Sequence, residues 1–162
     1  MKIGTNFWIW VSPFRTDRDL ELIAKAKSMG ADVVEFAIED DGVVDAKLLR
    51  RALADNQVEC SVVGIFGPQR DFASEDPAVR SEGLEHAWRC LDLTAEVGAG
   101  VLTGAVVAAG CDQAVTESQR NRRLAFAAEV LQQIGEHSAK AGVRFGVEIL
   151  NRYESNLLTT AA

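Results

Sequence analysis

Apolar and polar positions change along this chain in two alternating patterns. Short, nearly continuous apolar runs rich in β-branched residues predict five strands, at residues 2–9, 32–37, 58–65, 101–107 and 143–148. Between them, apolar residues recur every three or four positions and predict four helices, at residues 17–29, 45–53, 77–97 and 116–140. Regular alternation of strands and helices is typical of βαβ units with a parallel sheet.

Cap and turn residues agree with these helix boundaries. Asp45 and Thr116 are suitable N-cap residues, and Gln119 follows Thr116 at the spacing of a capping box. Pro77 suits the first turn of the third helix. Glycines follow three of the helices, at positions 30, 98 and 142. Ser155 is a candidate cap for a fifth helix.

Two α/β architectures fit this order of elements. Continuous apolar strands suit a sheet that is buried on both faces. A doubly wound sheet would carry a glycine-rich phosphate loop after its first strand, but residues 8–13 are bulky and aromatic here. A (β/α)8 barrel needs about 250 residues. We therefore expect residues 1–162 to form a single partial domain, an incomplete TIM barrel of about five strands and four to five helices.

The strand ends carry the candidate chemistry. Glu148 ends an apolar strand, where a charge is costly to bury without compensation, and Glu154 follows it closely. Active sites of such barrels collect at the carboxyl ends of strands, where Asn6, Glu35 and Ala105 also fall. Taken alone, Glu148 could be a solvent-facing carboxylate and Glu154 a helix N-terminal acid.

Other conspicuous residues have simpler interpretations. We expect Glu35, at the end of the second strand, either to have a structural role or to support the residues that contact the ligand, and Asn151 and Arg152 to tie their loop together. We expect the acidic turn of Glu39, Asp40 and Asp41 and the arginines at 120, 122 and 123 to be solvated, and the helical residues His86 and Trp88 to pack.

Composition excludes several classes of protein. The chain is 48% hydrophobic and 25% charged with a net charge of −7, which disfavours nucleic-acid binding. It shows no signal peptide and no apolar run long enough to span a membrane. Cys60, Cys90 and Cys111 are too scattered for a metal or redox motif and are expected to be reduced thiols of a cytoplasmic protein.

Four segments together resemble the ketose 3-epimerases, a group that includes the D-tagatose and D-allulose (psicose) 3-epimerases of the xylose isomerase-like barrel superfamily. The most specific is Glu148-Ile149-Leu150-Asn151-Arg152-Tyr153-Glu154, and the others are residues 1–4, 30–35 and 74–80. The resemblance extends over the whole chain and corresponds to the N-terminal half of the family's length.

The resemblance implies a metal-dependent isomerase that epimerises a ketose at C3 through an enediolate. It makes Glu148 a metal ligand and catalytic acid/base, and Glu154 a contact to the sugar near O1. Asn6 and Ala105 are further candidate sugar contacts, and Trp8, Trp10 and Phe66 either pack or stack on the sugar. The family's remaining ligands are an aspartate, a histidine and a glutamate from later strands. Oxygen-rich ligation favours Mn²⁺, alternatively Mg²⁺ or Co²⁺.

Several alternatives remain open at this stage. The chain could be another enzyme of the superfamily, of the hydroxypyruvate isomerase or inosose type. It could instead be a non-catalytic half-barrel that pairs with another half through its open edge strands, and we expect a homo-oligomer in either case. The zinc-dependent apurinic endonucleases fit poorly, because no histidine lies at a strand end. Because half of the site is missing, we expect residues 1–162 alone to be weakly active or inactive.

Overall fold

The computed structural model describes residues 1–107 and 115–160. Within these residues, the predicted alternation is confirmed by five strands and four α-helices. The strands are β1 (Gly4–Asn6), β2 (Val33–Ile38), β3 (Glu59–Gly64), β4 (Val101–Val106) and β5 (Arg144–Glu148). The helices are α1 (Glu21–Ser28), α2 (Ala46–Asn56), α3 (Pro77–Val97) and α4 (Glu117–Ala141). Cys111 lies outside the described residues.

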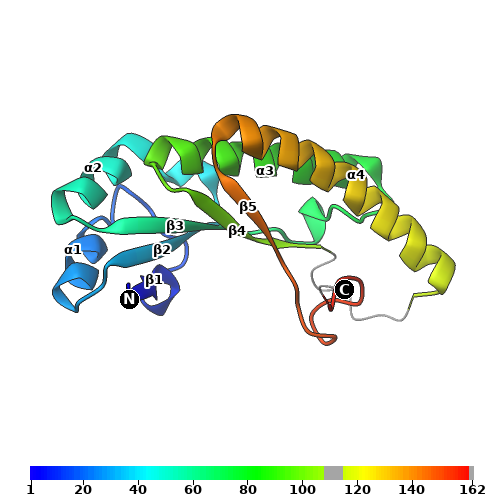
Figure 1. The fold of residues 1–162 in the computed structure, drawn as a ribbon, viewed down its shortest axis with the longest axis horizontal. Helices are drawn as coiled ribbons and strands as arrows, with labels where there is room; N and C mark the ends of the chain where they lie inside the picture. The colour runs from blue at the N-terminus through cyan, green and yellow to red at the C-terminus, as the bar shows by residue number, and fades with distance from the viewer. Residues whose placement is uncertain (108–114, 161–162) are drawn as a thin grey trace.

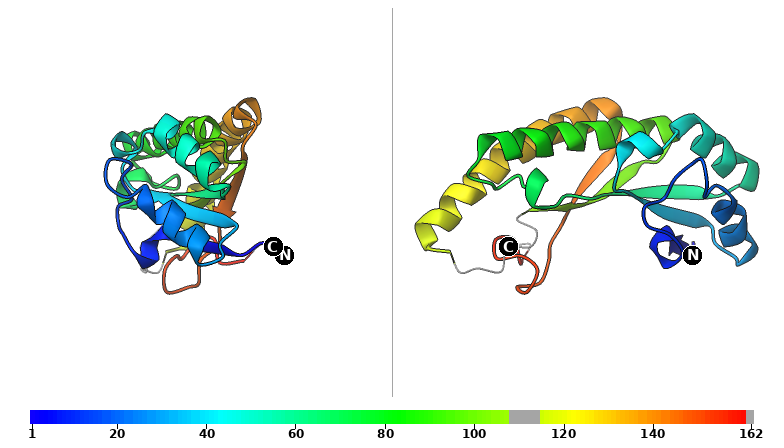
Figure 2. Two further views of the ribbon diagram at one scale, coloured as in Figure 1. Left: turned by 90° about the vertical axis from the view of Figure 1, so that its left-hand side faces the viewer. Right: turned by 180° about the vertical axis from the view of Figure 1, so that it is seen from behind.

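The strands form one parallel sheet in the order β1-β2-β3-β4-β5. Sequential order with a helix between neighbouring strands is the topology of a TIM barrel. The helices lie on one side of the sheet, with α3 and α4 side by side over β4 and β5 (Figures 1 and 2). The predicted half-barrel is therefore confirmed.

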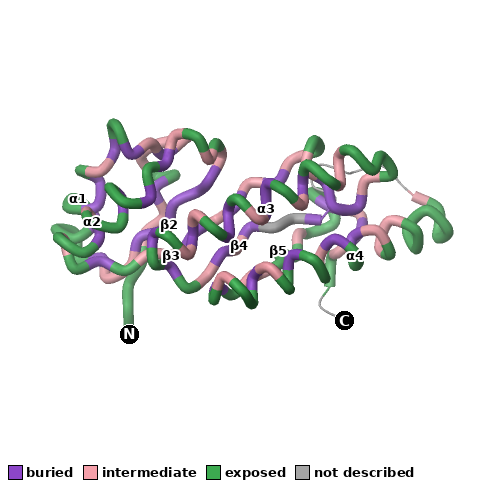
Figure 3. Tube along the Cα trace, turned by 90° about the horizontal axis from the view of Figure 1, so that it is seen from above, coloured by how far each residue is buried: buried purple, intermediate pink, exposed green. Residues whose placement is uncertain are grey.

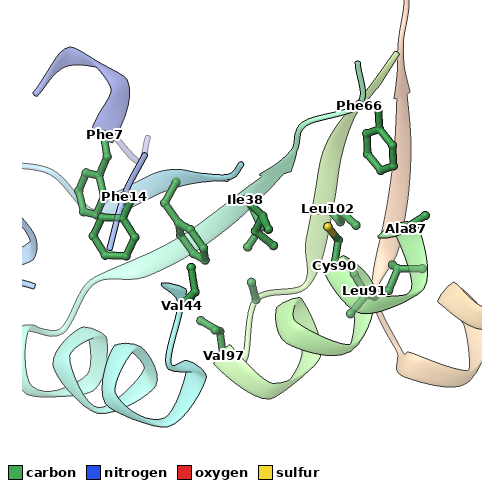
Figure 4. Packing of buried hydrophobic residues seen from close by; sticks show 14 of the residues in the cluster. Phe7, Phe14, Ile38, Val44, Phe66, Ala87, Cys90, Leu91, Val97 and Leu102 are labelled. Atoms are coloured by element: carbon green, nitrogen blue, oxygen red, sulfur yellow. The ribbon is translucent and has the colours of Figure 1, made fainter. Parts of the chain in front are cut away.

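The core lies between this sheet and its helices. Val34, Phe36 and Ile38 alternate along β2 and are completely buried on the helix side. Figure 4 shows Leu102 of β4 close to Cys90 and Leu91 of α3. Along α3 and α4, buried and exposed positions alternate, so each helix presents one apolar stripe to the core (Figure 3).

The opposite face of the sheet is not buried, which corrects the prediction of a sheet covered on both faces. Glu35, Ser61 and Thr103 lie on this inner face and are half-exposed. No helix of the described residues covers them (Figure 1). The inner face would be the interior of a closed barrel, which the described strands enclose only in part.

The first strand is much shorter than predicted. Only Gly4–Asn6 pairs with β2, and residues 7–9 form a 3₁₀ turn instead. The side chain of Asn6 caps this turn by accepting a hydrogen bond from the backbone N–H of Trp8 at 2.8 Å. The turn places Phe7 in the core against Phe14, with ring centroids 5.0 Å apart (Figure 4). Aromatic content alone did not reveal this local cap.

Two predicted helix starts are also wrong. α1 begins at Glu21 rather than near Asp17, because the preceding turn is held by Asp19, whose carboxylate accepts hydrogen bonds from the Arg15 backbone and the Arg18 guanidinium. Ser155 caps no helix within the described residues. Its hydroxyl donates to the Val107 carbonyl at 3.0 Å and accepts from the Leu157 N–H at 3.3 Å, which attaches the last segment to the end of β4.

The arginines of α4 do not form one solvated face. Arg122 is exposed and pairs with Glu75, but Arg123 forms an ion pair of 3.1 Å with Asp71 in which both side chains are at most 12% exposed. Arg123 also donates to the Ala73 carbonyl at 3.1 Å. Arg123 therefore attaches α4 to the loop that follows β3.

The acidic turn after β2 is partly solvated, as predicted, with Asp40 exposed, but Glu39 and Asp41 also make structural contacts. The Glu39 carboxylate accepts hydrogen bonds from the Trp8 indole and the Ser12 hydroxyl, and Asp41 pairs with Arg89 at 2.6 Å. Burial opposes ionisation of Asp41, but the Arg89 guanidinium outweighs it and holds the pKa of that carboxyl below its usual range.

His86 packs in the core, as predicted for a residue of α3. It is completely buried, its ring meets Phe66 edge-on at 5.1 Å, and Arg70 donates a hydrogen bond to its Nε2 at 3.3 Å. An acceptor at Nε2 requires the neutral imidazole. Burial, together with the positive charge of Arg70, lowers the pKa of His86 to about 4.

Acid should therefore destabilise the fold through His86. The unfolded histidine titrates near 6.5, so between pH 6.5 and 4 the unfolded chain binds more protons than the folded one. This contribution to stability is complete above pH 6.5 and is lost as the pH falls toward 4. We expect the free energy of unfolding in urea titrations to be roughly 2–3 kcal/mol lower at pH 4.5 than at pH 7. His86→Leu should flatten this dependence, whereas His137→Gln, at a half-exposed site, should retain it; an unchanged slope in His86→Leu would contradict the assignment.

Among the described residues, no helix is both long enough and apolar enough to cross a membrane.

Candidate functional site

A hollow of about 390 Å³ lies on the inner face of the sheet, toward the carboxyl ends of the strands. All five strands border it or reach it through the turn after β1. Its lining includes Asn6, Trp8, Glu35, Thr103, Gly104 and Glu148. Residues that are up to 142 positions apart in the chain are thus brought to one concave surface, as expected for the C-terminal face of a barrel.

Strand register explains why these side chains converge. Asn6 is level with Glu35, and Glu35 is level with Ser61 on the next strand. Val63 is likewise level with Thr103. Residues that are level on neighbouring parallel strands point to the same face, so each inward position extends into a row across the sheet.

Gly104 interrupts β4 beside the hollow. Its φ of +83° lies in the left-handed region, and the register between β4 and β5 shifts between Leu102 and Ala105. A Cβ atom at this position would lie 2.4 Å from Val63 Cγ1 and 2.8 Å from the Gly64 carbonyl oxygen. The irregular strand therefore depends on the absence of a side chain.

Gly104→Ala should lower the free energy of unfolding by about 2–4 kcal/mol, because it combines a left-handed conformation with overpacking. Gly100→Ala is the matched control, since a Cβ there meets nothing within 4 Å and φ is not positive. Chemical denaturation measures both variants. Equal stability of the two would show that β4 can adopt another backbone path.

Glu148 lies at the end of β5, exposed on the border of the hollow and level with Val106 of β4. Ala105 lies one position earlier, where its backbone is level with Val147. Of the residues predicted from the sequence, Asn6 and Glu148 thus line the hollow from opposite edges of the sheet, and Ala105 follows Gly104, which also lines it.

Glu154 is not part of this lining. It is exposed, and its carboxylate accepts a hydrogen bond from the side-chain amide of Asn151. Asn151 also accepts from the Tyr153 N–H at 2.9 Å, and its carbonyl accepts from the Ser155 N–H. Asn151 therefore ties this loop together, as predicted, and Glu154 belongs to the loop rather than to the hollow.

The three aromatic candidates, Trp8, Trp10 and Phe66, lie in different surroundings. Phe66 is buried against Phe72, with ring centroids 5.0 Å apart, and Trp10 packs against Phe7 with Lys25 Nζ 4.8 Å from its ring centre. Of these three, only Trp8 lines the hollow, and it is 49% exposed. Trp8 is therefore the candidate for contact with a ligand, while Phe66 and Trp10 pack.

Sequence reasoning missed two polar residues of the inner face, Ser61 and Thr103. The signal was present in the alternation of β3 and β4, where each is a hydroxyl residue next to a completely buried apolar position, Val62 or Leu102. The prediction that both strands are buried on both faces overlooked this alternation.

The described residues do not form a metal site by themselves. They contain no cluster of three or more His, Cys, Asp or Glu side chains suited to hold an ion. Glu148 is an exposed strand-end carboxylate of the type that hard divalent cations prefer. Any ion bound there would need ligands other than those that the described residues bring together.

Comparison with known proteins agrees with this geometry. Residues 23–162 match the model of the family described as "Xylose isomerase-like TIM barrel". The chain is 29% identical over 160 residues to the ketose 3-epimerase of Arthrobacter globiformis and 31% identical over 165 residues to the L-ribulose 3-epimerase of Mesorhizobium japonicum. A solved structure of L-ribulose 3-epimerase superposes with a TM-score of 0.85 at 29% identity, covering 99% of this chain and 53% of that one.

The matches cover nearly all of this chain but only part of each relative. Each of the two relatives matches 99% of this chain, but the chain spans only 55% and 54% of their respective lengths. The 162 residues thus correspond to about half of a related barrel.

Proposed function

Since the chain belongs to the xylose isomerase-like TIM barrel family, we propose that it forms half of the active site of a metal-dependent isomerase that epimerises a ketose at C3. The observation that carries this proposal is the hollow in which Asn6 and Glu148, the last residues of β1 and β5, meet Trp8 and Glu35; Glu35 lies in the middle of β2 rather than at the strand end that the sequence predicted. The similarity of the whole chain to ketose and L-ribulose 3-epimerases supports the reaction class.

Glu148 is the residue suited to the proton transfer. Epimerisation at C3 removes a proton from the carbon next to the carbonyl and returns one to the other face of that carbon. A carboxylate in an open hollow can accept this proton and give it back, and such general acid–base steps contribute roughly 10²–10⁴-fold. The second acid/base required on the opposite face would come from outside the described residues.

A divalent ion, Mn²⁺ or alternatively Mg²⁺ or Co²⁺, is the cofactor that we propose, with Glu148 as one ligand. Such an ion, when bound, supplies Lewis-acid stabilisation of the negative charge on the sugar oxygens. Asn6 and the Ala105 backbone are proposed to contact the sugar, and Glu154 to reach it near O1 through movement of its loop.

The isolated chain should bind the ion weakly, because one carboxylate is a poor site for a hard cation. Calorimetry with MnCl₂ is expected to give a dissociation constant above the micromolar range, and D-fructose should be converted slowly or not at all. Micromolar affinity together with epimerase activity of residues 1–162 alone would contradict this half-site account.

A fused barrel tests the function itself. It joins residues 1–162 to the C-terminal part of the A. globiformis ketose 3-epimerase that lies beyond the matched region. We expect the fused barrel, with Mn²⁺, to interconvert D-fructose and D-allulose, as measured by liquid chromatography, and to lose this activity with EDTA. A folded, metal-loaded fused barrel that leaves D-fructose and other ketoses unchanged would contradict the proposal.

A second candidate function, a half-barrel that pairs with another copy, is favoured by the sheet edges. Large apolar side chains are exposed beside both edge strands: Ile3 and Ile9 at β1, and Val147 and Ile149 at β5. Edge strands with unpaired backbone groups and apolar side chains favour association, so we propose a homo-oligomer. Light scattering after size-exclusion chromatography should show a dimer or larger species; a stable monomer would contradict pairing.

We also propose a cytoplasmic location, since Cys60 and Cys90 are free thiols. Burial raises the pKa of Cys60 to about 11 and of Cys90 to about 12, so both are unreactive.

A further inference from the structure

Glu35 stands out on the inner face because its charge has no cationic partner. The Asn6 amide donates to its Oε1 at 2.8 Å, and the Ser61 hydroxyl donates to its Oε2 at 2.9 Å. Both donors are neutral, and no ion pair among the described residues includes Glu35. A half-buried carboxylate whose partners are all neutral is compensated less well than one in an ion pair, and such a residue invites a functional explanation.

The two hydrogen bonds leave Glu35 capacity for more. A carboxylate offers about four acceptor positions, and one on each oxygen is occupied here. Glu35 lines the same hollow as Glu148 but from β2, three strands away in the sheet. Three strand spacings correspond to about 14 Å along the curved sheet, and the direct path across the concave face is shorter.

A chain of hydrogen bonds connects Glu35 to Trp8. Asn6 donates to Glu35 and accepts from the Trp8 backbone, while the Trp8 indole donates to Glu39 at 3.0 Å. Trp8 is therefore held beside the hollow by one hydrogen bond from its backbone and one from its indole. Asn6 acts here as a positioning residue between a carboxylate and an aromatic ring that both face the same space.

We propose that Glu35 and Trp8 form a second subsite, which holds the end of the sugar farthest from Glu148. The two Glu35 oxygens accept hydrogen bonds from neighbouring hydroxyls, and the Trp8 ring lies against the C–H groups between them. A polyol suits this pair better than a cation, because no cluster of three metal-binding side chains surrounds Glu35 in the described residues. This inference rests on the proposed function, since it assumes that the ligand is a sugar.

Glu35→Gln is the variant that separates this role from a structural one. The amide oxygen of Gln can still accept from Asn6, and its NH₂ can donate to the Ser61 hydroxyl, so the fold should persist. The substitution removes the negative charge and one of the two acceptor oxygens of residue 35. Glu59→Gln is the matched control, because Glu59 lies on the neighbouring strand β3 of the same sheet but pairs with Lys2 outside the hollow.

The test is a titration of the ¹⁵N-labelled chain with D-fructose, followed by NMR. We expect the Asn6 side-chain NH₂ and Trp8 indole N–H signals to shift saturably, and the apparent Kd to rise at least fivefold in Glu35→Gln but not in Glu59→Gln. Hydroxyacetone, which lacks the distal hydroxyls, should leave both signals in place. Equal titrations of Glu35→Gln and the wild type, or equal shifts with hydroxyacetone and D-fructose, would overturn the subsite.

The hydroxyacetone comparison uses the wild-type chain and therefore decides the matter even if Glu35→Gln does not fold. The fused barrel separates the two proposals. If it is inactive but D-fructose still shifts the Asn6 and Trp8 signals, the subsite stands and the epimerase proposal fails. If it is active and Glu35→Gln leaves KM unchanged, the subsite fails and the epimerase proposal stands; a raised KM with an unchanged kcat supports both.

Discussion

Glu148→Gln in the fused barrel is expected to reduce kcat for D-fructose epimerisation by roughly 10²–10⁴-fold. Gln keeps the shape of the side chain at the end of β5 but can neither accept the C3 proton nor offer a charged ligand. Because Glu148 is exposed at the border of the hollow, the substitution should leave the free energy of unfolding within about 0.5 kcal/mol of the wild type.

The matched control is Glu59→Gln, a carboxylate on a strand of the same sheet that lies outside the hollow. It should retain nearly full activity. If Glu148→Gln and Glu59→Gln were equally active, the strand-end carboxylate would not be the proton carrier, and the chemistry would have to be assigned elsewhere in the barrel.

Arg123→Ala is expected to lower the free energy of unfolding by about 3 kcal/mol, because breaking a buried ion pair leaves a charge in a poorly solvated place. The guanidinium holds both the Asp71 carboxylate and the Ala73 carbonyl. Denaturation in urea measures the loss, and the wild-type slope should be retained if only the native state changes.

Arg122→Ala provides the control on the neighbouring residue of the same helix. Arg122 pairs with Glu75 at 3.0 Å, but both side chains are more than half exposed, so the change should be within about 0.5 kcal/mol. Equal losses in the two variants would show that helix propensity, rather than the buried pair, sets the stability of α4.

The pattern of the sequence predicts the order of strands and helices because that order depends on local periodicity. Caps with short-range partners were equally accessible: Asp45 accepts from the N–H groups of Lys47 and Leu48, and Thr116 forms its capping box with Gln119. These interactions span three residues or fewer and can be read directly from spacing.

Long-range partners explain what the sequence did not reveal. Arg123 and Asp71 lie 52 positions apart, and nothing in the neighbourhood of either distinguishes their pair from the exposed one formed by Arg122. The residues of the candidate site also differ in whether local sequence or long-range contacts reveal their role. Glu148 stands out because its own segment is unusual, whereas the role of Glu35 depends on Asn6 and Ser61, which only the register of three strands brings together.

The most direct test of the central claim is the position at which solvent deuterium enters the sugar. The Mn²⁺-loaded fused barrel is incubated with D-fructose in D₂O, and the products are examined by ¹H and ²H NMR. We predict that deuterium enters at C3 of fructose and allulose, and that Glu148→Gln prevents it. Exchange confined to C1, as in aldose–ketose isomerisation, or exchange at C3 that persists in Glu148→Gln, would contradict the assignment of this half-barrel to a ketose 3-epimerase site.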